Sequence, residues 1–496
     1  MQKKWCISVF TFTLLALVGI AILVYVIDPF FVYHKPLKIF SYHYTNEAYQ
    51  VPGIARNFSY DSIVTGSSMT ENFSTDYINQ MFQGNTVKLC YSGATLKNQK
   101  DILDLALKRN NNSTKRVIMS MDLWNFQNDY DMVNNSSPQY LYDKSKFNDI
   151  KYLLNKDVLQ NAIAPIIENT LKGEKTQSMD SAFRWWGFPY GDYAIFQQWE
   201  MPNYSSGKPL PSNSFNNSAL ENLNYNLKPL FEKYPEIDFY VFFPPYSILY
   251  WYDQSQTMDA LMEMREKIVK QLLMYENVYI FDFQSEKNII TNLWNYKDTK
   301  HYSPEINDFM TTCFKEKKYI ITEEAQIIEN NNKLRKNICE WDIKSIIANP
   351  IWKINDINEY TNYLLDKNYI AYMAVNNDSS WSWTNELAEY WKNAGSQYNL
   401  AEYHETSYIA ILDNGYIKME ALSKDKLEYD ENEIKLTSKG SSIDGYASII
   451  INNVEYSQNS RGLNIVVYDK KRGIVIDSIC FDTCNGLNAQ RLHGWR

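Results

Sequence analysis

The sequence predicts an α/β fold, a mostly parallel sheet flanked by helices, with a transmembrane helix before it and a β-rich α+β domain after it. Three observations lead to this class. An uncharged apolar run covers residues 5–27, short apolar runs alternate with helical patterns between about residues 55 and 320, and strand-like runs dominate residues 338–496. A chain of 496 residues is also too long for one ordinary core, so we expect two or three domains.

The first run is long enough to cross the hydrocarbon core of a bilayer. Lys3 and Lys4 precede it and Asp28 follows it, so the positive-inside rule places the N-terminus in the cytoplasm. A cleaved signal peptide is the alternative, but its apolar region would be shorter and would end in small residues. Bulky residues continue here to Pro36. We therefore expect a single-pass anchor in the cell membrane, with the bulk of the chain outside the cytoplasm.

Composition excludes some classes of partner and cofactor. A net charge of −9 argues against binding of nucleic acid and against binding of anionic lipid through a cluster of basic residues. No pair of cysteines or cluster of cysteine and histidine has the spacing of a zinc site. Outside the cytoplasm two disulfides are permitted, Cys480 with Cys484 or Cys313 with Cys339, and the sequence does not decide between paired and free thiols.

Five short apolar runs have the character of buried strands. They cover residues 60–65, 86–91, 116–121, 237–243 and 278–283, and helical patterns cover residues 70–82, 96–108, 219–233 and 258–275. This alternation predicts a parallel sheet with helices on both faces and a ligand site at the carboxyl ends of its strands. Residues 127–216 are less regular, and we interpret them as an insertion over that edge, a lid or a substrate wall.

Two aromatic features near the predicted edge have open interpretations. The run Trp185-Trp186-Gly187-Phe188 in the insertion is either a platform for a sugar or a small satellite core. The two prolines after Phe243 end the fourth strand, and they either only stop it or also aim Tyr246 at the site.

Gly66-Ser67-Ser68-Met69 follows the first strand directly and opens a helix. A serine there lies at the carboxyl end of the strand, where its backbone amide can face a developing oxyanion. Gly66 allows the tight turn that exposes the hydroxyl. Taken alone, a serine at a helix start is usually only an N-cap.

Asp298 and His301 follow the fifth strand, three residues apart. On a turn this spacing lets the carboxylate orient the imidazole, whose other nitrogen then serves as general base toward a serine. Taken alone, the pair is a helix cap with an exposed histidine. Ser68 lies about 230 residues earlier, yet the parallel topology brings both segments to one edge of the sheet. We therefore predict a catalytic triad of Ser68, His301 and Asp298.

Residues 55–320 resemble the SGNH/GDSL hydrolase superfamily in these blocks. Ser68 stands where that family has its nucleophile, and Ser67 replaces the family's aspartate. Gly93, in Cys90-Tyr91-Ser92-Gly93-Ala94, corresponds to the glycine whose amide is an oxyanion donor. The third block departs from the pattern, because no Gly-x-Asn-Asp follows the third strand. Asp122 or Asn125 stands in for the oxyanion asparagine, with Asn125 as our candidate, or that donor is missing.

The weakened third block is more typical of acyl-handling branches than of lipases. The chain is most similar to the membrane-anchored DltD-like and alginate-acetylation-like proteins, which act on cell-envelope polymers beside a membrane-bound O-acyltransferase. The resemblance implies no metal and no organic cofactor.

The C-terminal residues resemble the interleukin-like EMT inducer (ILEI) domain, a compact β-rich module. The matching segments are residues 372–380, 461–469, 473–478 and 481–483, within about residues 345–490. In glycosyltransferase stems such modules are associated with carbohydrate recognition, and a structural spacer is the equal alternative. We expect this domain at residues 338–496, after a polar helical linker at residues 321–337.

Together these features predict a serine esterase or O-acyltransferase acting on acyl (acetyl) esters of a cell-surface polysaccharide or teichoic-acid-like polymer. The alternative is a non-catalytic, polymer-binding accessory protein for a membrane-bound O-acyltransferase. The intact serine, histidine and aspartate argue against this alternative, because a pure scaffold has no physical need for all three.

Overall fold

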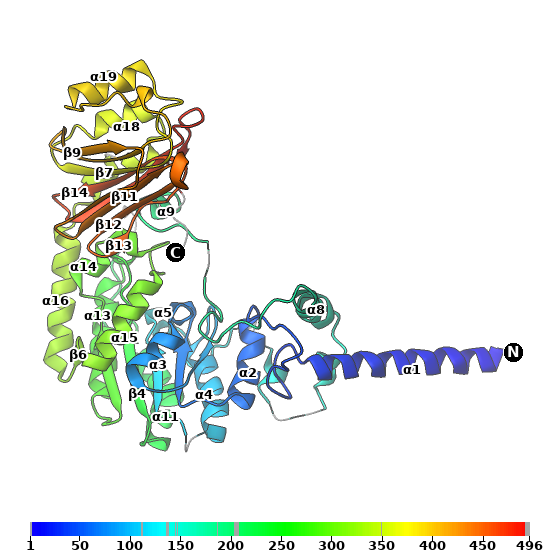
Figure 1. Cartoon of the computed structure of the whole chain (residues 1–496). Coiled ribbons are helices and arrows are strands. Elements are labelled where there is room, and N and C mark those ends of the chain that lie inside the picture. Colours follow the sequence, from blue (N-terminus) through cyan, green and yellow to red (C-terminus); the bar gives the residue numbers. More distant parts are fainter. Residues whose placement is uncertain are drawn as a thin grey trace.

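The computed structural model describes residues 2–110, 113–134, 138–143, 145, 147–185, 187–202, 208–348 and 350–491. A long helix, α1 (Gln2–Ile27), leads into an α/β unit, and a β-rich unit stacks on that unit (Figure 1). The predicted α/β class, with a second β-rich sheet and one apolar N-terminal helix, is confirmed at this level.

The first unit is built on a six-stranded sheet in the order β2-β1-β3-β4-β5-β6. Its strands are β1 (Ser62–Gly66), β2 (Thr86–Cys90), β3 (Arg116–Ser120), β4 (Asp238–Phe243), β5 (Val278–Asp282) and β6 (Ile320–Ile321). The first five run parallel, as predicted, because each is an apolar run buried under helices. The antiparallel strand β6 was not predicted, since two residues are too short to show a period.

Helices cover the sheet on both sides. They include α2 (Glu47–Asn57), α3 (Thr75–Phe82), α4 (Leu96–Asn110), α10 (Asn216–Asn222), α11 (Lys228–Lys233), α13 (Met258–Leu272), α15 (Pro304–Glu316) and α16 (Glu324–Glu340). The helix expected at residues 70–82 is split into a short 3₁₀ turn, η1 (Ser68–Thr70), and α3. The Ser74 side chain accepts a bond from the Tyr77 backbone N–H and so begins a new helix. The segment expected as a linker forms most of α16, which packs on α13.

The C-terminal turn of α1 is part of the first unit's core, where Val24 and Ile27 are buried. Asp28 ends the helix, and its carboxylate accepts bonds from the backbone N–H groups of Val32, Tyr33 and His34 at 2.7–2.9 Å. Among the described residues, one helix, at residues 3–27, is long and apolar enough to cross a membrane. A membrane anchor and a signal sequence both fit that length and composition.

The second unit holds a ten-stranded sheet with the path β13-β12-β11-β7-β14-β15-β16, to which β8, β9 and β10 add. The strands are β7 (Tyr369–Asn377), β8 (Ser407–Asp413), β9 (Tyr416–Ser423), β10 (Leu427–Glu431), β11 (Ile434–Gly440), β12 (Tyr446–Ile451), β13 (Val454–Glu455), β14 (Gly462–Asp469), β15 (Ile474–Phe481) and β16 (Ala489–Gln490). Side chains of β7 alternate between two cores, so both faces of the sheet are covered. All six cysteines carry free thiols in the structure.

The insertion joins the two units. Its short helix α9 (Asp192–Phe196) lies against the C-terminal unit. The Arg472 guanidinium pairs with the buried carboxylate of Asp192 at 3.0 Å, and the Phe196 ring stacks on Trp352 with centroids 4.5 Å apart. A buried ion pair and a stacked pair of rings fix the stacking of the units seen in Figure 1.

Candidate active site

The structure brings Ser68, His301 and Asp298 together at the carboxyl edge of the parallel sheet, where the turn that holds Asp298 and His301 is bonded to Ser247 in the loop after β4. Ser68 begins η1 directly after β1, and His301 lies just before α15. Ser68 Oγ lies 2.8 Å from His301 Nε2, and His301 Nδ1 lies 2.7 Å from Asp298 Oδ2. Each imidazole nitrogen thus has its own partner, which is the geometry that lets a histidine take a proton from a serine hydroxyl.

Asp298 is held as a carboxylate. Its Oδ1 accepts bonds from the backbone N–H groups of Lys300 at 2.8 Å and His301 at 2.9 Å. Burial opposes the ionised form, but the bond and charge of His301, with these two backbone bonds, outweigh it and lower the pKa of Asp298. The acceptor of the triad is therefore charged at neutral pH.

A second carboxylate lies beneath the nucleophile turn. Asp122, fully buried at the end of β3, accepts bonds from the hydroxyls of Ser67 at 2.6 Å, Ser120 at 3.0 Å and Tyr246 at 3.2 Å. Burial raises its pKa, and the three hydroxyl bonds oppose that rise. A carboxylate that accepts three hydroxyl bonds serves as an anchor for the turn and is unsuited to donate to an oxyanion. The two prolines therefore do more than end the strand, because they are followed by Tyr246, whose hydroxyl bonds to this anchor.

Gly66 makes the nucleophile turn possible. Its φ is +151°, and a Cβ there would lie 2.4 Å from Ser120 Oγ. Any side chain at this position would push apart the ends of β1 and β3.

The predicted oxyanion loop, Ser92-Gly93-Ala94, follows β2, and Gly93 has a left-handed φ of +71°. The backbone N–H groups of Ser68 and Gly93 donate to no acceptor within the described part of the chain. Asn125 lies buried in α5 (Leu123–Gln127), and its Nδ2 donates to the Ala94 carbonyl at 3.3 Å. Asn125 thus braces this loop, and its role as an oxyanion donor stays a prediction.

Trp185 stands beside the triad. Its ring meets the His301 ring at 85°, with centroids 4.9 Å apart, and Lys297 Nζ lies 3.7 Å from its centroid. Lys297 also lies 4.2 Å from the centroid of the Phe188 ring. The aromatic run of the insertion therefore forms a wall of the site, while Trp186 lies outside the described residues.

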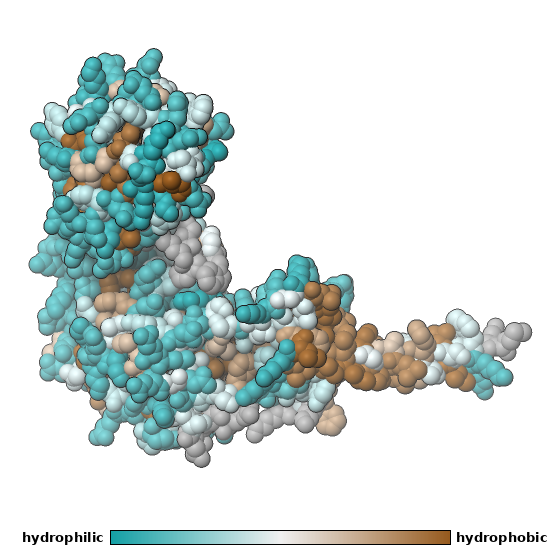
Figure 2. All heavy atoms as spheres, viewed as in Figure 1, coloured by the Kyte–Doolittle hydropathy of each residue, from teal (hydrophilic) through white to brown (hydrophobic). Residues whose placement is uncertain are grey.

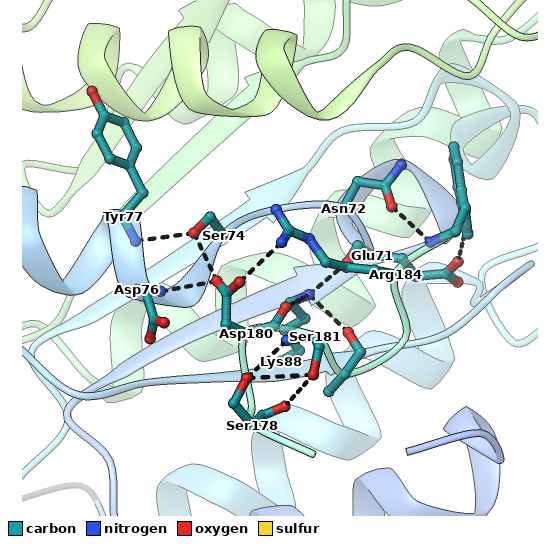
Figure 3. Close-up of polar contacts among 12 residues, drawn as sticks. Glu71, Asn72, Ser74, Asp76, Tyr77, Lys88, Ser178, Asp180, Ser181 and Arg184 are labelled. Atoms are coloured by element: carbon teal, nitrogen blue, oxygen red, sulfur yellow. Dashed lines mark hydrogen bonds and ion pairs between the residues drawn. The ribbon is translucent and has the colours of Figure 1, made fainter. Parts of the chain in front are cut away.

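Lys88 docks this wall onto the nucleophile turn (Figure 3). It points from the centre of β2 into the protein, fully buried, and its Nζ donates to the carbonyls of Glu71, Asp180 and Ala182 at 2.8–2.9 Å. Burial lowers its pKa to about 7, yet three acceptors require the three N–H donors that only the ammonium form has. The sequence signal for this clamp, a lysine inside the apolar strand Thr86–Cys90, was overlooked.

Further contacts in Figure 3 extend the clamp along the insertion. Asp180 accepts bonds from Ser74 Oγ at 2.7 Å and from the Asp76 backbone N–H at 3.1 Å, and it pairs with Arg184 at 2.9 Å. Residues 178–185 are thereby fixed to the segment that follows the nucleophile.

We expect Lys88→Met to destabilise the protein by about 2–4 kcal/mol, because it leaves three buried carbonyls without a donor. The insertion should also detach locally, and limited proteolysis should then cut faster within residues 178–185. Thermal unfolding and mass spectrometry of the fragments measure both effects. Lys172→Met is the matched control, because that lysine is exposed and pairs only with Glu168. A Lys88→Met variant that behaves like this control would contradict the clamp.

Glu71 connects the wall to the oxyanion loop. Its carboxyl group accepts bonds from Ser92 Oγ at 2.9 Å and from Trp185 Nε1, and it is hydrogen-bonded to the Glu47 carboxyl group. Glu47 in turn accepts a bond from the Ser92 backbone N–H at 2.9 Å. Burial, and then the charge of Glu47, raises the pKa of Glu71 to about 8, so the pair holds one proton at neutral pH.

This pair should make stability depend on pH. The folded-state pKa of Glu71, about 8, exceeds its ordinary value of 4.5, so its contribution is fully present below 4.5 and is lost as the pH rises through about 8. We expect the melting temperature of the wild type to fall across that window and the fall to be smaller in Glu71→Gln. Thermal unfolding from about pH 5 to about pH 9 measures this difference. Equal slopes in both proteins would show that Glu71 does not titrate there.

The arrangement is suited to nucleophilic acyl transfer. It combines a serine hydroxyl on a histidine base with a carboxylate that orients the base, and the Ser68 backbone N–H has no acceptor among the described residues. No family model matches the chain, and no curated protein matches it either. Geometry and residue chemistry therefore carry the assignment of function.

Proposed function

We propose that the chain is a membrane-anchored serine esterase or O-acyltransferase. The observation that carries this proposal is the contact of Ser68 Oγ with His301 Nε2 at 2.8 Å, with His301 Nδ1 bound to Asp298. A half-buried hydroxyl–imidazole–carboxylate series at the carboxyl edge of a parallel sheet has a direct chemical use in acyl transfer.

In the first half-reaction Ser68 Oγ attacks the acyl carbonyl carbon while His301 Nε2 takes the hydroxyl proton. The carbonyl oxygen becomes an oxyanion, which the N–H groups of Ser68 and Gly93 stabilise, with Asn125 as the third candidate donor. The intermediate collapses, the ester C–O bond breaks, and His301 returns the proton to the leaving alcohol. An acyl ester on Ser68 remains.

In the second half-reaction an acceptor hydroxyl gives its proton to His301 and attacks the acyl carbonyl, and Ser68 leaves with that proton. Water as acceptor makes the protein an esterase, and a sugar hydroxyl makes it a transferase. The substrate class we propose is an acetylated cell-surface polysaccharide or a teichoic-acid-like polymer, with the C-terminal unit holding the glycan and a membrane-bound O-acyltransferase as partner. The resemblance to the SGNH and ILEI families supports this class.

Retention of α1 as an anchor is supported by its packing. Cleavage near its end would remove Val24 and Ile27 from the core and would leave the Tyr42 hydroxyl without the Ile27 carbonyl to which it donates. Losing two buried aliphatic side chains costs several kcal/mol, on the order of 2–5 for each.

The proposal is tested by trapping the acyl-enzyme. The full chain in detergent is mixed briefly with p-nitrophenyl acetate and quenched in acid, and its peptides are analysed by mass spectrometry. We expect an acetyl ester on the peptide that contains Ser68, and none in Ser68→Ala. Ser380→Ala is the matched control, since Ser380 Oγ also lies 2.6 Å from a histidine, His404, in the C-terminal unit. A folded wild type without an acetyl ester on Ser68 would favour the non-catalytic, polymer-binding alternative.

A further inference from the structure

Large apolar side chains are exposed beside the base of α1. The exposed fraction is 97% for Phe147, 83% for Leu171, 69% for Ile39 and 60% for Ile150, and Ile167 adds 38%. Apart from Ile39, which follows α1, these residues belong to the insertion, on and around α6 (Ile150–Leu153) and α8 (Ala164–Leu171). We call these five residues the apolar foot. Such a cluster on a folded surface indicates a binding partner.

The apolar foot is held firmly against the end of α1. α6 packs on α1, and the Tyr152 hydroxyl donates to Asp28 Oδ1 at 2.9 Å. The Tyr33 hydroxyl donates to Asp149 Oδ2 at 3.1 Å, and the Ser41 backbone N–H donates to Thr170 Oγ1 at 2.9 Å. These bonds tie both ends of the α6–α8 segment to the chain that leaves α1.

The hydrophobic surface of α1 continues without a break onto this region (Figure 2). Exposed lysines occur on the same segments, namely Lys35, Lys38, Lys151 and Lys156, and the exposed acidic residues there are Asp157 and Glu168, of which Glu168 pairs with Lys172. An apolar surface flanked by lysines suits the boundary of a bilayer, where the apolar groups enter the acyl region and free ammonium groups meet lipid phosphates.

We propose that the apolar foot lies in the interface of the same bilayer that α1 spans, so that the protein contacts the membrane through a second, lipid-facing surface. This inference rests on the proposed role of α1 as an anchor. A lipid occupant is favoured over a protein because the surface is continuous with α1 and begins where α1 would leave the hydrocarbon core. A helix alone leaves the rest of the chain free to swing, whereas two contacts fix its orientation.

The test places the full chain in phosphatidylcholine nanodiscs that contain a lipid with a photoreactive diazirine high in its acyl chain. After irradiation, labelled peptides are located by mass spectrometry. We expect labels in α1 and in residues 147–171, and none in α16, where Ile328 is also 43% exposed. α16 lies on the side of the first unit away from α1 (Figure 1).

The double variant Ile150→Asp with Leu171→Asp should lower the labelling of residues 147–171 to the level of α16, with α1 labelled as before. Ile328→Asp is the matched control and should leave the pattern unchanged. In the wild type, labels in α1 but not in residues 147–171 would overturn the inference and assign the surface to a protein partner. An unlabelled α1 would overturn the anchor itself. Ester hydrolysis, followed in parallel, reports separately on the proposed activity.

Discussion

Ser68→Ala and His301→Ala should each lower kcat for hydrolysis of p-nitrophenyl acetate by on the order of 10⁴–10⁶-fold. Without Oγ there is no nucleophile, and without the imidazole there is no base 2.8 Å from Oγ to take its proton. Because the two side chains act in one step, the double variant should be no slower than either single variant. Steady-state kinetics of the three variants, purified identically, measure this non-additivity.

The rate of ester hydrolysis that remains in the three variants tests the proposed oxyanion donors. Amides of Ser68 and Gly93 remain in all three variants, so hydrolysis should stay above the rate in water. Melting temperatures should remain within a few degrees of the wild type, because Ser68 and His301 lie at the edge of the core. If kcat of the double variant were lowered by the product of the two single effects, Ser68 and His301 would act in separate steps. The proposed mechanism would then be wrong.

Asp298→Asn should lower kcat by on the order of 10⁴-fold while leaving KM nearly unchanged. The amide keeps the shape of the carboxylate, but it carries no charge to stabilise the imidazolium, and its NH₂ group favours the wrong tautomer of His301. Kinetics on a short acyl ester, measured from neutral to alkaline pH, separate kcat from KM.

Asp76→Asn is the matched control for this prediction, because Asp76 is exposed, lies near the nucleophile turn and contacts no member of the triad among the described residues.

Since the pKa of Asp298 is lowered below its ordinary value of 3.8, its ionised form stabilises the fold above that value, and the contribution is lost only as the pH falls through the lowered pKa. The loss of activity in Asp298→Asn should therefore persist throughout the neutral range. An equal loss in Asp76→Asn would point to general damage to the turn.

Sequence patterns were sufficient for the parts of the fold that depend on local periodicity. The five parallel strands follow from apolar runs, and the meeting of Ser68 with Asp298 and His301 follows from the rule that parallel strands share one carboxyl edge. The break between η1 and α3 was missed, because the Ser74 cap competes with a continuous helical pattern.

Interactions with the insertion could not be predicted. Lys88 and Glu71 are charged residues whose partners Asp180 and Trp185 lie in the insertion, and no periodic pattern shows where residues 127–216 fold back. The aromatic run at Trp185 was noticed, but only the fold places its ring against His301. Buried charges of this kind mark where tertiary structure overrides local preference.

The ion pair between Asp192 and Arg472 has a consequence for biosynthesis. Asp192 is fully buried once the chain is folded, and its guanidinium partner is translated 280 residues later. Until Arg472 has emerged, an unpaired carboxylate cannot leave water at low cost, so α9 cannot settle. The contact between the two units at α9 therefore forms only when nearly the whole chain has been made, whereas the wall at Trp185 can already bond to Glu71 and Asn72.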